Sequence, residues 1–183
     1  MALDSSKVNV AVSGAVAYAP VGTDGPTDAS TPLPPEFRDV GFISEDGVTE
    51  ARERSTNNII AWQNAEVVRV VTTESSLTVS FTMIESNPNS LELYYGSAVN
   101  TTDGSIEINP GESGGRRSFV VDYVDGDKLV RLYIPEGELT ETGESVLSSG
   151  EAVGYEVTIT GYPSADAGFS AKKWYSDLVG SGS

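Results

Sequence analysis

The chain contains no cysteine and no histidine among its 183 residues. Disulfide bridges, thiolate-bound zinc and catalysis by an imidazole base are therefore excluded. It also lacks any run of about 18 apolar residues, and its first residues, Met1–Val10, do not show the basic-then-apolar order of a signal peptide. We expect a protein that has no membrane anchor and is assembled in the cytoplasm.

Basic residues are scarce. The sequence has 11 Lys and Arg against 27 Asp and Glu, which gives a net charge of -16 and an isoelectric point near 4.1. Proteins that read DNA or RNA sequences need a basic face to meet the phosphates. The composition therefore argues against that class. The simplest role of the negative charge is to keep the protein soluble and to suppress unwanted association.

Repeated helical periodicity is absent, and alternating apolar and polar residues are frequent. Alternation predicts a long strand across 67–83 and a core strand across 153–159. The runs FVVDYV and KLVRLYI flank Asp125-Gly126-Asp127 and predict a hairpin. We also expect a strand over 7–19 with a bend at Gly14. These patterns favour one mostly β, antiparallel domain of the sandwich or barrel type.

One short helix is predicted at 88–95. Asn87 is a favoured N-cap, Pro88 suits the first helical position, and Gly96 can end the helix.

Three further segments carry weaker signals. Asp46-Gly47 suits a tight hairpin turn, with a returning strand that starts at Val48. Trp62 is more often a core residue than a contact residue. The segment 135–150 mixes Glu with Gly and Thr, which predicts an exposed connection.

Residues 20–35 form a long loop that contains five prolines. Such a loop is either a disordered linker or an ordered contact loop. After Pro163 the chain becomes rich in small residues, apart from the cluster AKKWYSDL. An exposed Trp174 there would reduce solubility, so it either folds back onto the domain or meets a partner.

No motif in the sequence carries a recognisable reaction. GESGGRR at 111–117 lacks the Lys-Ser or Lys-Thr ending of a phosphate-binding loop. Asp122, Asp125 and Asp127 do not follow the calcium-loop pattern. Paired carboxylates could serve a glycosidase, but an acidic chain contains such pairs by chance. We expect no enzyme activity, no metal and no cofactor.

Four phrases occur in an order and spacing that chance would hardly reproduce: GAVAYAP at 14–20, FRDVGFISEDGVTE at 37–50, IIAWQNAEVVRVV at 59–71 and SFTMIESNPNSLELYYG at 80–96. In these phrases the chain resembles the major tail tube proteins of long, non-contractile-tailed bacteriophages, in the form found in phages of actinobacteria. The resemblance covers roughly the first half of the sequence.

The resemblance implies a structural virion protein, a siphovirus tail subunit that forms stacked, hexameric rings. The rings build a tube that conducts DNA to the host. It implies a tail tube domain over 1–163, including the loop at 20–35, and a C-terminal arm over 164–183. The partners it implies are other copies of the chain, the tape-measure protein, the tail terminator and tail-tip proteins. The genomic DNA would pass through without specific binding.

A tube suggests roles for particular residues. Candidates for contacts between subunits lie in the loop, in a basic pair and near the C-terminus: Pro32, Leu33, Pro34, Pro35, Phe37, Arg116, Arg117, Trp174 and Tyr175. Candidates for acids that face the channel are Glu45, Asp46, Glu50 and Glu53. Carboxylates there would repel DNA phosphates and let the duplex slide.

A different class of function stays open on the sequence alone. A β-sandwich could use Trp62, Trp174 and tyrosines to stack on carbohydrate, as an adhesion or fibre module of a phage tail does. Exposed, coplanar aromatic rings would identify that class.

Overall fold

The computed structural model describes residues 3 and 7–179. Two expectations fall partly outside the described residues. The absence of a signal peptide concerns residues 1–2 and 4–6, and the end of the expected C-terminal arm lies at 180–183. Within the described part, no helix is both long enough and apolar enough to cross a membrane.

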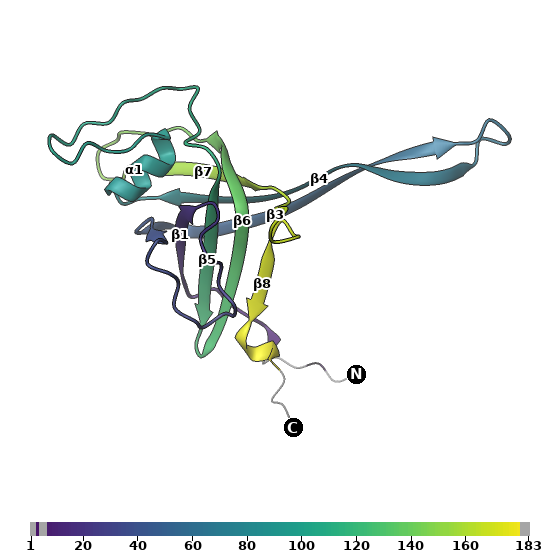
Figure 1. The fold of residues 1–183 in the computed structure, drawn as a ribbon, viewed down its shortest axis with the longest axis horizontal. Coiled ribbons are helices and arrows are strands. Elements are labelled where there is room, and N and C mark those ends of the chain that lie inside the picture. The colour runs from purple at the N-terminus through teal and green to yellow at the C-terminus, as the bar shows by residue number, and fades with distance from the viewer. Residues whose placement is uncertain (1–2, 4–6, 180–183) are drawn as a thin grey trace.

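In its described part, the protein is built on one antiparallel sheet with a single α-helix beside it (Figure 1). This confirms the predicted mostly β class. The spatial order of the sheet is β2 (Arg38–Asp39), β1 (Ser13–Pro20), β5 (Arg117–Asp125), β6 (Lys128–Thr142), β7 (Tyr155–Gly161), β4 (Val67–Met83) and β3 (Ile43–Ile60), while β8 (Lys172–Tyr175) pairs with β6. A short 3-10 turn (Ser176–Leu178) follows β8.

One face of this sheet carries the hydrophobic core. Alternate residues of the strands meet there with Leu93 of the helix, and the largest fully buried members include Tyr18, Phe119, Met83, Ile134 and Ile159. The alternation therefore identifies core positions correctly over 77–83 and 155–159, whereas Val67 and its neighbours at the start of β4 are exposed. The hairpin predicted at Asp125-Gly126-Asp127 is also confirmed, since β5 ends at Asp125 and β6 begins at Lys128.

Helix α1 (Pro88–Tyr95) forms as the sequence predicts. The Asn87 side chain accepts hydrogen bonds from the backbone N–H groups of Asn89 and Ser90, both at 2.9 Å. The Ser90 hydroxyl accepts the Asn87 N–H at 3.0 Å, which completes a capping box. Gly96 ends the helix in the left-handed conformation, at φ 74°.

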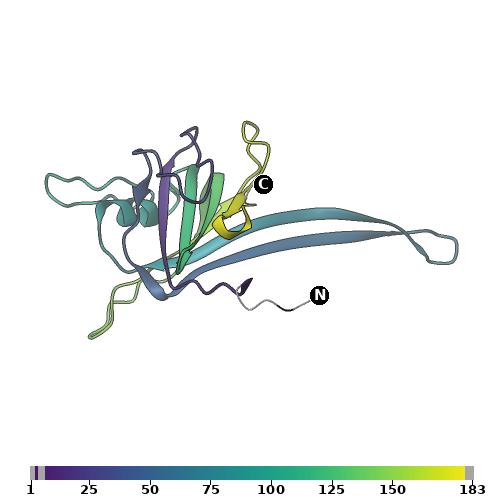
Figure 2. The same ribbon diagram turned by 90° about the horizontal axis from the view of Figure 1, so that it is seen from below.

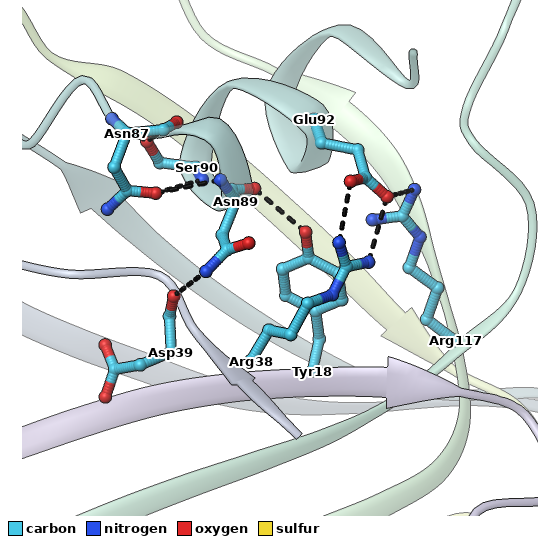
Figure 3. A network of polar contacts seen from close by, with 8 residues as sticks. All are labelled: Tyr18, Arg38, Asp39, Asn87, Asn89, Ser90, Glu92 and Arg117. Carbon is cyan, nitrogen blue, oxygen red and sulfur yellow. Dashed lines mark hydrogen bonds and ion pairs between the residues drawn. The ribbon is translucent and has the colours of Figure 1, made fainter. Parts of the chain in front are cut away.

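A polar network docks this helix onto β1 and β2 (Figure 3). Arg38 donates to both carboxylate oxygens of Glu92, at 2.8 and 3.0 Å, and Arg117 lies 3.3 Å from the same carboxylate. Both guanidinium groups stack on the Tyr18 ring, and the Tyr18 hydroxyl donates to the Asn89 carbonyl. The hydrogen bonds from Arg38 hold the pKa of Glu92 below its usual value, against the opposing effect of burial.

The loop at 20–35 is folded onto the second face of the sheet, over β5 and β6. The buried guanidinium of Arg131 pairs with Asp122 at 2.7 and 2.8 Å and donates to the carbonyl groups of Thr31 and Asp28, at 2.6 and 3.3 Å. One side chain of β6 thus holds two points of the loop. The loop is an ordered segment rather than a disordered linker.

Two local features shape this loop. The Asp28 carboxylate accepts hydrogen bonds from the hydroxyl and N–H groups of Thr31 and Ser30, which hold the pKa of Asp28 far below its usual value. Gly25 lies against the Tyr133 ring, where an added Cβ atom would come within 2.6 Å of the ring. The chain can therefore approach β6 closely at this point.

The predicted hairpin at Asp46-Gly47 is wrong. β3 continues through these residues, and a change of register between Ile43 and Val48 accommodates them as a bulge. Gly47 adopts the left-handed conformation that such a bulge requires, at φ 69°. The real turn between β3 and β4 lies further on, at 61–66, where Asn64 and Ala65 adopt positive φ.

The predicted burial of Trp62 is also wrong, because its side chain is 98% exposed in that turn. The exposed connection expected over 135–150 begins only after Thr142, where β6 ends. Gly137 makes the longer strand possible, since an added Cβ would come within 2.8 Å of Phe119. The strand expected over 7–19 begins at Ser13.

Replacing Arg131 with Met should lower the free energy of unfolding by about 3 kcal/mol, because Asp122 and two carbonyl groups lose their partner. Denaturant unfolding measures the loss, and limited proteolysis within 20–35 should become faster. The Arg131→Lys variant is the control, since it keeps the charge and should lose less. A loss of under about 1 kcal/mol in Arg131→Met would contradict the role assigned to this residue.

Glu92 should contribute stability that depends on pH. Its pKa is lower in the folded protein, so the ionised group stabilises the fold at neutral pH and this contribution is lost as pH falls below the unfolded value, about 4.3. The difference in Tm between the wild type and Glu92→Gln should therefore shrink on acidification through that range. A difference that stays constant from neutral to acidic pH would contradict the ion-pair account.

Candidate assembly surfaces

Within the described residues, two long stretches of strand edge have no strand partner, besides the open edges of the short strands β2 and β8. β3 pairs with β4 on one side only, along its whole length. The last residues of β6, 138–142, pair with β7 but lie beyond the end of the β5 pairing at Gly137. A groove of about 360 Å³ runs beside this second edge, between residues 139–142, the tyrosines of α1 and the segment 108–113.

The run from one free edge to the other contains four strands, in the order β6, β7, β4 and β3. Each neighbouring pair is antiparallel. The free edge of β3 therefore runs in the opposite direction to the free edge of β6. Two copies placed edge to edge would continue the antiparallel alternation, and each further copy would do the same.

The second face of this four-strand run is polar and uncovered by the loop at 20–35. We call it the bare face. Its residues alternate along each strand with the core-facing residues: Thr49, Ala51, Glu53 and Ser55 on β3, Glu74, Ser76, Thr78, Ser80 and Thr82 on β4, Glu156, Thr158 and Thr160 on β7, and Glu138 and Glu141 on β6. Hydroxyl groups pair across it, as between Ser80 and Thr158 at 2.9 Å. None of these residues is Lys or Arg.

The four acids predicted to face a channel occupy different places. Glu53 lies on the bare face. Glu50 lies on the core-face side of β3 and is bonded to Lys173 of β8. Glu45 and Asp46 lie exposed in the bulge at the start of β3. The bare face adds four acids that sequence reasoning missed: Glu74, Glu138, Glu141 and Glu156.

The far part of the β3–β4 hairpin projects from the body of the protein (Figures 1 and 2). We call residues 53–76 the arm, because Arg52 and Leu77 form the last pair before β4 joins β7. The arm extends roughly 25 Å, at about 3.3 Å per residue. Its outer part carries exposed apolar side chains: Ile59, Ile60, Trp62, Val67, Val68 and Val70.

The residues predicted for contacts between subunits fall into three groups. The first group lies at the end of the loop at 20–35. Pro32 and Pro35 are exposed there, while Leu33, Pro34 and Phe37 are half-buried.

The basic pair is engaged within the chain. Arg116 bonds to Glu136 at 3.0 Å and stacks on Tyr162, and Arg117 joins the Glu92 network. Their role in contacts between subunits stays a prediction.

The last group lies on β8. Trp174 and Tyr175 are half-buried, because β8 pairs with β6, and Lys172 stacks on the Trp174 ring. Trp174 therefore folds back onto the domain. Since β8 and the arm tip are separate elements (Figure 1), Trp174 and Trp62 do not form the flat aromatic platform that carbohydrate binding requires.

Three of the described carboxyl groups have clearly shifted pKa values. The clearly shifted pKa values are those of Asp28, Glu92 and Asp103, and each is lowered, in Asp103 by hydrogen bonds from Ser105. A general acid needs a raised pKa instead. Within the described residues, no group of three or more Asp and Glu is placed to hold a metal ion.

A search among curated proteins found no significant match. Solved structures give distant similarities. The tail of an empty gene transfer agent particle, refined with C6 symmetry, is 10% identical over 89% of this chain and 96% of that one, with a TM-score of 0.46. The sheath–tube complex of an extracellular contractile injection system is 11% identical over 87% and 94%, with a TM-score of 0.40. A crystal structure of an Hcp protein is 9% identical over 87% and 96%, with a TM-score of 0.33.

The sequence profile of one family, described as phage tail tube protein, matches residues 1–179. The match spans nearly the whole sequence and confirms the resemblance seen in the four phrases. This chain therefore belongs to the phage tail tube protein family and is a structural subunit of a phage tail.

Proposed function

We propose that six copies of this chain close into a ring by joining the free edge of β3 to the free edge of β6 in the next copy. The observation that carries the proposal is the pair of unpaired edges at the two ends of one antiparallel four-strand run. Edge pairing would satisfy the backbone groups that each edge leaves open. Because the two edges are different surfaces, the contact is head-to-tail and closes by rotation.

The groove beside residues 139–142 supports this arrangement. It leaves room for an extended segment to add to the β6 edge, in the manner of β-strand addition. The tyrosines and the segment 108–113 would flank the added strand. The incoming strand is β3 of the neighbour, whose outer edge is unpaired for its full length.

In such a ring the bare face lines the channel. Its hydroxyl groups and carboxylates offer DNA phosphates no cation to bind, so the duplex meets a like-charged wall. Glu53 keeps the role that the sequence suggested, together with Glu74, Glu138, Glu141 and Glu156. The opposite arrangement, with the core face inward, would expose a hydrophobic surface and is unfavourable.

Other elements of the proposal follow from family membership. Rings of the chain stack into a tube in the virion, and they are assembled in the host cytoplasm. The tape-measure protein, the tail terminator and the tail-tip proteins are further partners. The protein is not an enzyme. It forms one tail tube domain over 1–163, followed by a C-terminal segment over 164–183 that is separate from the arm at 53–76. The loop residues Pro32–Pro35 and Phe37 remain candidates for contacts between rings.

The absence of cysteine allows a direct test of ring closure. Ala51→Cys faces the channel side of the β3 edge, and Thr140→Cys lies on the β6 edge. Under oxidation, the double variant should form a ladder of covalent oligomers that ends at six, seen on denaturing gels after assembly. Thr49→Cys and Glu53→Cys, each with Thr140→Cys, cover the neighbouring registers.

The matched controls are the single cysteine variants, which can form nothing larger than a dimer. Tubes that are visible by electron microscopy but yield no ladder in any of the three registers would contradict edge pairing. A ladder that ends at another number would contradict the sixfold ring.

A further inference from the structure

The arm tip and a second apolar surface lie at opposite ends of the same strand. The tip carries Ile59, Ile60 and Trp62 at the end of β3. At the start of β3, a groove of about 370 Å³ is lined by residues of 11–14, 41–48 and 121–123. We call it the start groove. Its rim includes Phe42 and Val12, which are 74% and 73% exposed.

We propose that the arm tip of one copy docks into the start groove of another copy, with Trp62 as the inserted side chain. This rests on the proposed function, since it describes how copies of the chain contact each other beyond the ring edges. The tip cannot reach the groove of its own chain. Val48 and Ile60 are separated by a paired strand of roughly 40 Å, at about 3.3 Å per residue.

Charge supports a second copy as the occupant. The arm holds two Arg and three Glu, a net charge of -1, while the rest of the chain holds 9 Lys and Arg against 24 Asp and Glu, a net charge of -15. The arm therefore carries less negative charge per residue than the rest of the chain, and another acidic copy repels it less strongly.

The individual charges are also complementary. Arg69 pairs across the hairpin with Ile59, next to the tip, and forms no ion pair within the described residues. The start groove has two charged lining residues, Glu45 and Asp122, and both are acidic. Asp122 is already paired with Arg131, which leaves Glu45 to meet Arg69 of the docked arm.

The geometry makes this contact head-to-tail. A tip at one end of β3 that fits a groove at the other end can be repeated without limit, because each added copy presents a fresh tip or a fresh groove. Burying a fully exposed Trp side chain at the centre of such a contact would supply much of its binding energy. The contact is suited to joining one ring to the next.

Trp62 can report on its own burial. In a Trp174→Phe background it is the only tryptophan. Acrylamide should quench its fluorescence freely in the unassembled protein, and severalfold less in assembled tubes. Adding Phe42→Asp in the groove should restore free quenching and leave unstacked rings in electron micrographs. Leu147→Asp, a substitution at an exposed apolar residue outside the groove, is the matched control and should change neither result.

A charge exchange tests the partner residues. Arg69→Glu and Glu45→Arg should each weaken stacking, and the two together should restore it.

The outcomes separate this inference from the proposed function. Stacked rings in which Trp62 stays freely quenched would overturn the inference while the ring proposal stands. If Trp62 is still protected from acrylamide quenching in tubes of the Phe42→Asp variant, the start groove is not the site where the arm tip docks. If neither rings nor tubes form in the Trp174→Phe background or in the wild type, the proposed function fails and the inference fails with it.

Discussion

Unpaired strand edges are the constraint on which the rest of this structure depends. A sheet of this size leaves rows of backbone N–H and C=O groups open wherever a strand lacks a neighbour. Natural monomers shorten or cover such edges, but β3 is 18 residues long and pairs on one side only. A protein with this edge either aggregates or assembles in a defined way. Membership of the tail tube family identifies defined assembly as the outcome.

The remaining surfaces fit that constraint. The loop at 20–35 covers the second face of β5 and β6 and is fixed there by Arg131, whereas the second face of β7, β4 and β3 is left bare. One half of the sheet is thereby sealed and the other half is polar. The net charge of -16 opposes premature association and is screened beyond about 10 Å at 0.1 M salt. Contacts that form must therefore be close and specific.

The sequence predicted most of the core and little of the assembly geometry. Alternation around Val79, Phe81 and Ile159 marks buried strands because a core requires apolar residues at every second position. The cap at Asn87 is local chemistry and is equally readable. Trp62 was misplaced because an exposed apolar residue and a core residue look the same in a single sequence. The interruption at Asp46-Gly47 was misread because a bulge and a hairpin use the same residues.

The central claim is that the four-strand run continues from one copy to the next and that its bare face lines the channel. Electron cryomicroscopy of tubes assembled from the purified protein, at a resolution that traces strands, tests this most directly. The account predicts a closed antiparallel barrel around the channel in which β3 of each copy lies beside residues 138–142 of its neighbour, with Glu53 and Glu156 facing inward. A tube whose channel is lined by any other face of the sheet would contradict it.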